Sequence, residues 1–126
     1  MHQLALGLAA VVALAIIVIG VLYLSRPRAA TLSFGLPLPE EGPNITWWLR
    51  LKGVRDIASG LAVLAFLVWG GSHMVGIILL VEAIIPVGDM LVILAAKGSA
   101  RAAFGMHGVT ALVMILAAVP LIIGGA

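Results

Sequence analysis

The sequence contains no cysteine and has few charged side chains. Without cysteine, the chain can form neither a disulfide nor a thiolate metal site, and it offers no site for palmitoylation. Charged residues make up 10% of the 126 residues, whereas soluble domains carry about a quarter. A chain with so little polar surface does not fit the class of water-soluble globular proteins, and we expect it in a lipid bilayer.

Strong charge of either sign is also missing. Seven basic and five acidic residues leave a net charge of +2, although the sequence pI is about 9.7. This excess is too small for the basic surface that contacts a phosphate backbone, so no nucleic-acid partner is expected. The basic residues lie beside apolar runs, where they would orient the protein in a membrane.

Long apolar runs are what the sequence has in abundance. Hydrophobic residues make up 63% of the chain, and the mean hydropathy is +1.28. A helix needs about 20 apolar residues to cross the bilayer. The sequence therefore predicts an all-α integral membrane bundle of four transmembrane helices within a single domain, 1–126. The first run has no basic residues before it and is interpreted as a retained anchor helix rather than a cleaved signal. The four expected helices are 4–24, 49–70, 74–96 and 102–124.

The connection 25–48 is the one long polar stretch, and its four prolines argue against a continuous helix there. Basic residues flank this connection and the short 97–101 segment, whereas the opposite side carries no lysine or arginine. The positive-inside rule predicts a multi-pass protein of the cell membrane with both termini outside and both connections in the cytoplasm. The flanking basic residues are Arg26, Arg28, Arg50, Lys52, Lys97 and Arg101.

Two carboxyl groups, Glu82 and Asp89, lie inside the third apolar run, with Pro86 between them. Their spacing places all three residues on one face of a helix. A carboxylate in the bilayer core costs several kcal/mol unless it finds a partner, a proton or water. We therefore expect this face to contact protein or a cavity. Because no basic residue is expected at the depth of Glu82, that group should carry a proton or face water.

Other polar groups are expected at a similar depth. With a rise of about 1.5 Å per residue, Arg55, Asp56, Asp89 and His107 fall at one level near the cytoplasmic side. Their convergence would form a polar pocket; alternatively, Arg55 forms an ion pair with Asp89 or Asp56 that only fixes helix register. The candidates for acid–base catalysis are Asp89, Asp56 and His107. The candidates for ligand binding are Arg55, Glu82, Ser59 and Thr110.

No metal or cofactor is expected. Glu82, Asp89 and His107 offer suitable ligand atoms, but the sequence has only one histidine inside an apolar run and no Glu-x-x-His motif. Phosphate loops and nucleophile elbows are also missing from the sequence.

Four segments between about residues 34 and 121 resemble the integral-membrane family called domain of unknown function 4267. The GxRDxxxG and PxGD elements are the most specific of these. The resemblance implies a small four-helix membrane protein and brings no activity with it; the layout is also similar to DoxX-like membrane proteins. The matching segments are 34-FGLPLPEEG-42, 53-GVRDIASG-60, 86-PVGDMLVIL-94 and 107-HGVTA-111. The positions that carry the resemblance are Gly53, Arg55, Asp56, Gly60, Gly88, Asp89 and His107.

Three functions fit these features. In the first, the bundle binds an apolar or amphipathic small molecule, with acid–base chemistry by the buried acids and His107. In the second, the protein is an accessory subunit whose buried charges lock helix register. In the third, a homodimer exchanges protons for a small substrate through Glu82. The lipid bilayer is the expected partner in all three.

Overall fold

The computed structural model describes residues 2–124, which form helices and connecting segments without a strand. The all-α prediction is confirmed. Residues 1 and 125–126 belong to the predicted domain but lie outside the described residues.

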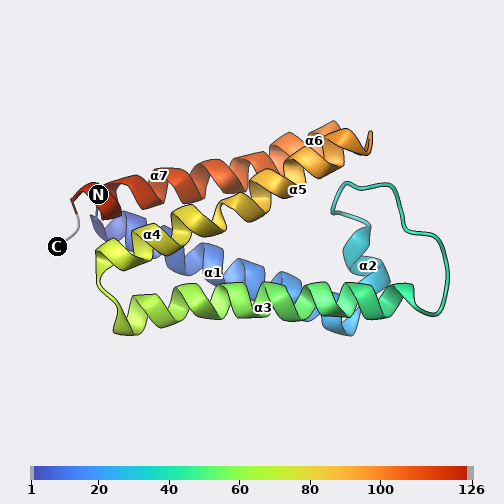
Figure 1. Ribbon diagram of the computed structural model, residues 1–126, viewed down its shortest axis with the longest axis horizontal. Helices are drawn as coiled ribbons and strands as arrows, with labels where there is room; N and C mark the ends of the chain where they lie inside the picture. The colour runs from blue at the N-terminus through green and yellow to red at the C-terminus, as the bar shows by residue number, and fades with distance from the viewer. Residues whose placement is uncertain (1, 125–126) are drawn as a thin grey trace.

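Four helical rods form two layers (Figure 1). The first rod (α1) and the second (α3) run side by side in opposite directions, and α2 with an irregular segment connects them. The third rod is α4 followed by α5, and the fourth is α6, η1 and α7 in succession. The start of α1, the end of α7 and the turn between α3 and α4 lie at one end of the molecule. The elements are α1 (His2–Ser25), α2 (Pro27–Thr31), α3 (Ile45–Trp69), α4 (Ser72–Glu82), α5 (Ile84–Ala95), α6 (Ala100–Ala102), η1 (Ala103–Gly108) and α7 (Val109–Ile123).

Three helical segments within 2–124 are long and apolar enough to cross a membrane, which supports a membrane protein. These are His2–Ser25, Ser72–Ala95 and Ala100–Ile123. The second predicted span, α3, is not among them. It has 25 residues, so its length suffices, but its first half carries four charged side chains. These are Arg50, Lys52, Arg55 and Asp56.

Glycines allow α1 and α3 to pack backbone against backbone. A Cβ atom on Gly53 would lie 2.6 Å from the carbonyl oxygen of Gly20, and one on Gly60 would lie 2.6 Å from that of Ala13. Neither position can hold a side chain without a shift of the main chain. Small residues of this kind permit close approach of helices in membranes. The contact also sets the rotation of α3, and so decides which of its side chains face α4 and α5.

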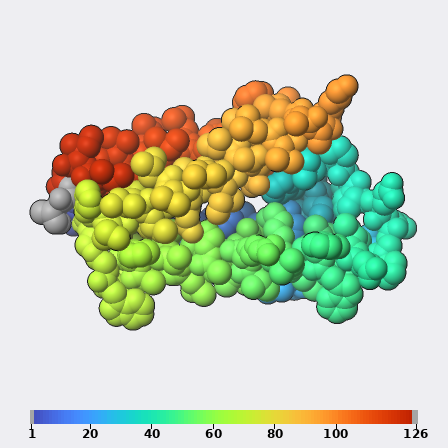
Figure 2. Space-filling model, in the orientation of Figure 1, coloured from blue at the N-terminus to red at the C-terminus, as the bar shows by residue number. Residues whose placement is uncertain are grey.

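Apolar packing is tight only at the end that holds the termini. There, Ala5, Ala9 and Ala13 of α1 are buried in one cluster with Leu79 of α4 and Leu121 of α7. Towards the other end, the Cα atoms of α5 stay more than 8 Å from those of α1 and α3. Figure 2 shows the molecule hollowed where α5 rises away from α3. The rods therefore enclose space near the connection between α2 and α3.

A break at Ala83 divides the third rod, where the sequence predicts one continuous helix. Pro86 has no N–H to donate to the carbonyl oxygen of Glu82 four residues earlier. α4 therefore ends at Glu82 and α5 begins at Ile84, while Ala83 itself donates to the Leu79 carbonyl and accepts from the Val87 N–H. The break lets α5 diverge from α3.

Candidate functional site

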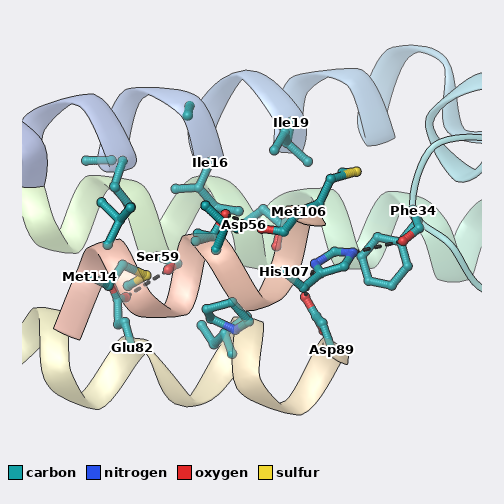
Figure 3. A pocket seen from close by; sticks show the side chains of 18 of the residues that line it. Ile16, Ile19, Phe34, Asp56, Ser59, Glu82, Asp89, Met106, His107 and Met114 are labelled. Atoms are coloured by element: carbon teal, nitrogen blue, oxygen red, sulfur yellow. Dashed lines mark hydrogen bonds and ion pairs between the residues drawn. The ribbon is translucent and has the colours of Figure 1, made fainter. Parts of the chain in front are cut away.

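A cavity of about 360 Å³ lies between the two layers, within the range typical of small-molecule sites (Figure 3). α1 supplies one apolar wall, which includes Ile16 and Ile19. The facing wall comes from α5, η1 and α7, and α3 closes the space between them. Most of the lining is aliphatic, and the polar side chains gather along α3, α5 and η1. The cavity is thus amphipathic.

Lys52 and Asp56 form an ion pair within α3, at the cavity end nearest the basic residues. The Lys52 ammonium donates to Asp56 Oδ2 at 2.7 Å and lies 4.1 Å from the centre of the Tyr23 ring. Asp56 is only 8% exposed. Their i, i+4 spacing places both on one helix face. A buried carboxylate thereby obtains a counterion without help from another helix.

His107 connects the cavity wall to the irregular segment before α3. Its Nε2 lies 2.8 Å from the carbonyl oxygen of Phe34, and the two rings pack with centroids 4.5 Å apart. Since a carbonyl oxygen only accepts, Nε2 must carry the hydrogen. Nδ1 lies 3.7 Å from Asp89 Oδ2, a separation too long for a hydrogen bond. The free edge of the imidazole therefore faces a carboxyl group across a narrow gap.

His107 sits in a π-helical turn, η1, which interrupts the fourth predicted helix. Such turns are rare and occur frequently at functional sites, because the inserted residue changes which side chains face inward. Here, Ala103 and His107 are the buried members of the turn. The widened turn belongs to the same cavity wall as Asp89.

Glu82 occupies the part of the cavity nearer the apolar cluster. Ser59 of α3 donates its hydroxyl hydrogen to Glu82 Oε1 at 2.8 Å, which joins α3 to α4 across the cavity (Figure 3). Pro86 and Asp89 line the same space one and two turns further along. One oxygen of the Glu82 carboxyl group is therefore already hydrogen-bonded to Ser59.

Six of the seven candidate residues from the sequence line the cavity: Asp56, Ser59, Glu82, Asp89, His107 and Thr110. The Thr110 hydroxyl donates to the Met106 carbonyl oxygen of its own helix. Arg55 is exposed and does not line the cavity, and the expected ion pair between Arg55 and Asp89 or Asp56 does not form among the described residues.

Lys52, Tyr23 and Phe34 line the cavity although the sequence did not single them out as site residues. From the sequence, Lys52 is predicted only to be one of the basic residues that orient the protein in the membrane. The i, i+4 relation between Lys52 and Asp56 is a signal that could have identified their pair. No comparable signal exists for Phe34, which reaches His107 across 73 positions of the chain.

Replacing His107 with leucine should loosen the segment around Phe34. The change removes the hydrogen bond to the Phe34 carbonyl and leaves that oxygen without its partner, at a cost of about 1.4 kcal/mol. This cost raises the population of the locally open segment about tenfold. We expect a Glu-specific protease to cut at Glu40 and Glu41 about tenfold faster. Thr110→Val is the control, because its hydroxyl bonds only within its own helix. Equal cleavage of wild type and His107→Leu would contradict the assigned contact.

A family model described as a domain of unknown function (DUF4267) matches residues 13–121. The matched region contains every polar side chain named in the cavity, from Tyr23 to Thr110. No curated protein and no solved structure matches the chain significantly.

Proposed function

Since the chain belongs to the DUF4267 family, whose description names no activity, we propose a function from the site: the protein binds an amphipathic small molecule within the membrane. The observation that carries this proposal is the cavity of about 360 Å³ between the two layers, aliphatic over most of its wall and polar at Lys52, Asp56, Asp89 and His107. A ligand with an apolar body and one polar group matches both parts.

The polar wall favours a ligand group that donates hydrogen bonds. Three carboxyl groups face the cavity, those of Asp56, Glu82 and Asp89, against the one ammonium of Lys52. Asp56 is already paired with Lys52, and Glu82 accepts from Ser59. Asp89 has no hydrogen bond to its side chain among the residues described. A hydroxyl or amine placed beside Asp89 and His107, off the line that joins them, would find an acceptor in Asp89.

Asp89 and His107 are the acid–base pair of this proposal. Their facing atoms, Oδ2 and Nδ1, lie 3.7 Å apart, and the Phe34 carbonyl fixes the hydrogen on Nε2. Nδ1 is therefore the ring atom that takes up or releases a proton. A ligand within hydrogen-bond reach of both groups could lose a proton to one and receive a proton from the other. Asp56 is less suited to this role because its carboxylate is paired with Lys52 at 2.7 Å.

We place α3 in the bilayer as the fourth span, which makes the protein a four-helix transmembrane bundle. Trp48 and Trp69 lie exposed near the two ends of α3, about 32 Å apart along its axis. This separation matches the hydrocarbon thickness between the two aromatic belts. Arg55 is close enough to the basic end for its guanidinium to reach the interface. The positive-inside rule then orients the basic end towards the cytoplasm and both termini outside.

An accessory role is supported less by this geometry. The ion pair at 2.7 Å lies wholly within α3, so it cannot lock one helix against another. The polar links between helices are the Ser59–Glu82 hydrogen bond and the approach of Asp89 to His107 at 3.7 Å. Proton-coupled transport would rest on Glu82, which faces the cavity and bonds to Ser59. For that function, Glu82→Gln should abolish proton-coupled flux in liposomes while the protein stays folded.

The binding function is tested by mass spectrometry of small molecules that co-purify with the protein. Wild type should retain a defined molecule, and Asp89→Asn should lose at least nine-tenths of it, because a donor group in the ligand loses its charged or proton-accepting partner. Glu41→Gln is the matched control, since this carboxyl is exposed in the segment before α3.

If wild type, Asp89→Asn and Glu41→Gln retained a defined molecule equally, Asp89 would not be part of the binding site. Bulk lipid alone in every sample would count against the binding function and favour the accessory one. Thermal unfolding of each variant checks that the loss does not come from misfolding.

A further inference from the structure

A second cavity, of about 320 Å³, lies directly beyond the polar end of the first. It is covered by the irregular segment before α3, including Leu36, Pro37 and Pro39, and it reaches Val92 on α5. We call it the loop-side cavity and the first one the main cavity. The two have four lining residues in common: Tyr23, Phe34, Lys52 and Asp89. One layer of side chains therefore separates two spaces of nearly equal volume.

Phe34 is the member of this layer that comes from the irregular segment before α3, and contacts on both sides hold it in place. Its ring packs against His107 and lies 5.1 Å from the Lys52 ammonium. Its carbonyl oxygen accepts from His107, and the next carbonyl, of Gly35, accepts from the N–H of Ser99 at 2.7 Å. Gly35 has a φ of 110°, which L side chains rarely adopt. The backbone on both sides of the ring is thus anchored to η1 and to the turn after α5.

The loop-side cavity is also mainly apolar. Leu36, Leu49, Val92 and the prolines form most of its wall. A hydrocarbon chain would therefore be accommodated there as well as in the main cavity, provided that it could pass the layer between them.

We propose that Phe34 is a specificity-determining partition: it ends the main cavity, limits the length of ligand that binds, and keeps the loop-side cavity as a separate compartment. This inference rests on the proposed binding function. Removal of the ring would join the two compartments into one elongated space of roughly twice the volume. Longer chains would then bind with their polar group still beside Asp89 and their end in the loop-side cavity.

The test uses a homologous series of straight-chain primary alcohols, from about 8 to about 18 carbons, each with a terminal photoreactive diazirine. The protein is held in lipid nanodiscs, and mass spectrometry of peptides locates the crosslinks. In wild type, we expect saturable labels on main-cavity residues such as Ile16 and Val113. At Leu36 and Val92, which are 37% and 56% exposed, we expect only the non-saturable label that alcohol dissolved in the surrounding lipid produces. In Phe34→Ala, the longer alcohols should label Leu36 and Val92 at least tenfold more than in wild type, because the overpacking penalty has gone.

Phe104→Ala is the matched control, since Phe104 is 57% exposed and lines neither cavity; it should retain the wild-type pattern. Phe34→Trp keeps an aromatic partition and should also leave Leu36 and Val92 without saturable label, which tests the inference if Phe34→Ala does not fold. Saturable labels at Leu36 or Val92 in wild type, or none there in a folded Phe34→Ala that is labelled in the main cavity, would overturn the partition. No saturable label in the main cavity of wild type would instead refute the proposed binding function.

Discussion

Replacing Lys52 with methionine is expected to destabilise the protein by about 3 kcal/mol, because it leaves the Asp56 carboxylate buried without a counterion. Asp56 is 8% exposed, and the Lys52 ammonium at 2.7 Å is the only cation in contact with it among the described residues. Methionine retains most of the aliphatic stem, so the loss comes from the charge rather than from packing. The free energy of unfolding is measured by titration with denaturing detergent.

Arg55→Met is the matched control, because Arg55 is exposed on the same helix and does not line the cavity. Its effect should stay within about 0.5 kcal/mol. A double variant, Lys52→Met with Asp56→Asn, should recover most of the lost stability, since no buried charge is left unpaired. If Arg55→Met were the more damaging single change, the rotation of α3 described above would be wrong.

Replacing Gly53 with alanine is expected to destabilise the protein by about 1–3 kcal/mol, the usual range for overpacking. The new Cβ would lie 2.6 Å from the Gly20 carbonyl oxygen and 3.1 Å from Tyr23 Cβ. The first neighbour is main chain and cannot turn aside, so α1 and α3 must separate. Gly53→Leu should prevent folding altogether. Both effects are measured by thermal unfolding and by the yield of monodisperse protein.

Gly88→Ala is the control for this prediction. Gly88 also belongs to the motif that resembles the family, but a Cβ there meets nothing within 4 Å. Alanine in place of glycine within a helix should be neutral or stabilise it by up to about 1 kcal/mol. Equal damage from Gly53→Ala and Gly88→Ala would show that close packing of α1 on α3 does not explain the glycines.

Much of the cavity follows from periodicity along the sequence. Glu82, Pro86 and Asp89 line one space because a helix repeats every 3.6 residues, and the break at Ala83 is too small to rotate α5 away from α4. The same regularity places Asp56 and Ser59 on a common face of α3. These relations are local, so they could be predicted without knowledge of the fold.

The i, i+4 spacing could have paired Lys52 with Asp56, but which face of α3 turns towards the cavity could not be predicted in this way. Successive residues on a helix are about 100° apart, so Arg55 and Asp56 point in clearly different directions although they share one depth. Depth along a helix axis does not fix the rotation of the helix about that axis. Contact of Gly53 and Gly60 with the backbone of α1 supplies that rotation, and it turns Lys52 rather than Arg55 towards the cavity.

By itself, the sequence determined that this protein is helical, that it belongs in a membrane, and that carboxyl groups and one histidine lie inside its apolar segments. These properties follow from composition and from spacing along single helices. Only the tertiary structure decided that α5 diverges from α3, that a π turn carries His107, and that Phe34 stands between two cavities. The break before Pro86 permits α5 to diverge, but its direction depends on how the helices pack against one another. The contact of Phe34 with His107 likewise joins residues 73 positions apart, so neither feature is set by one segment alone.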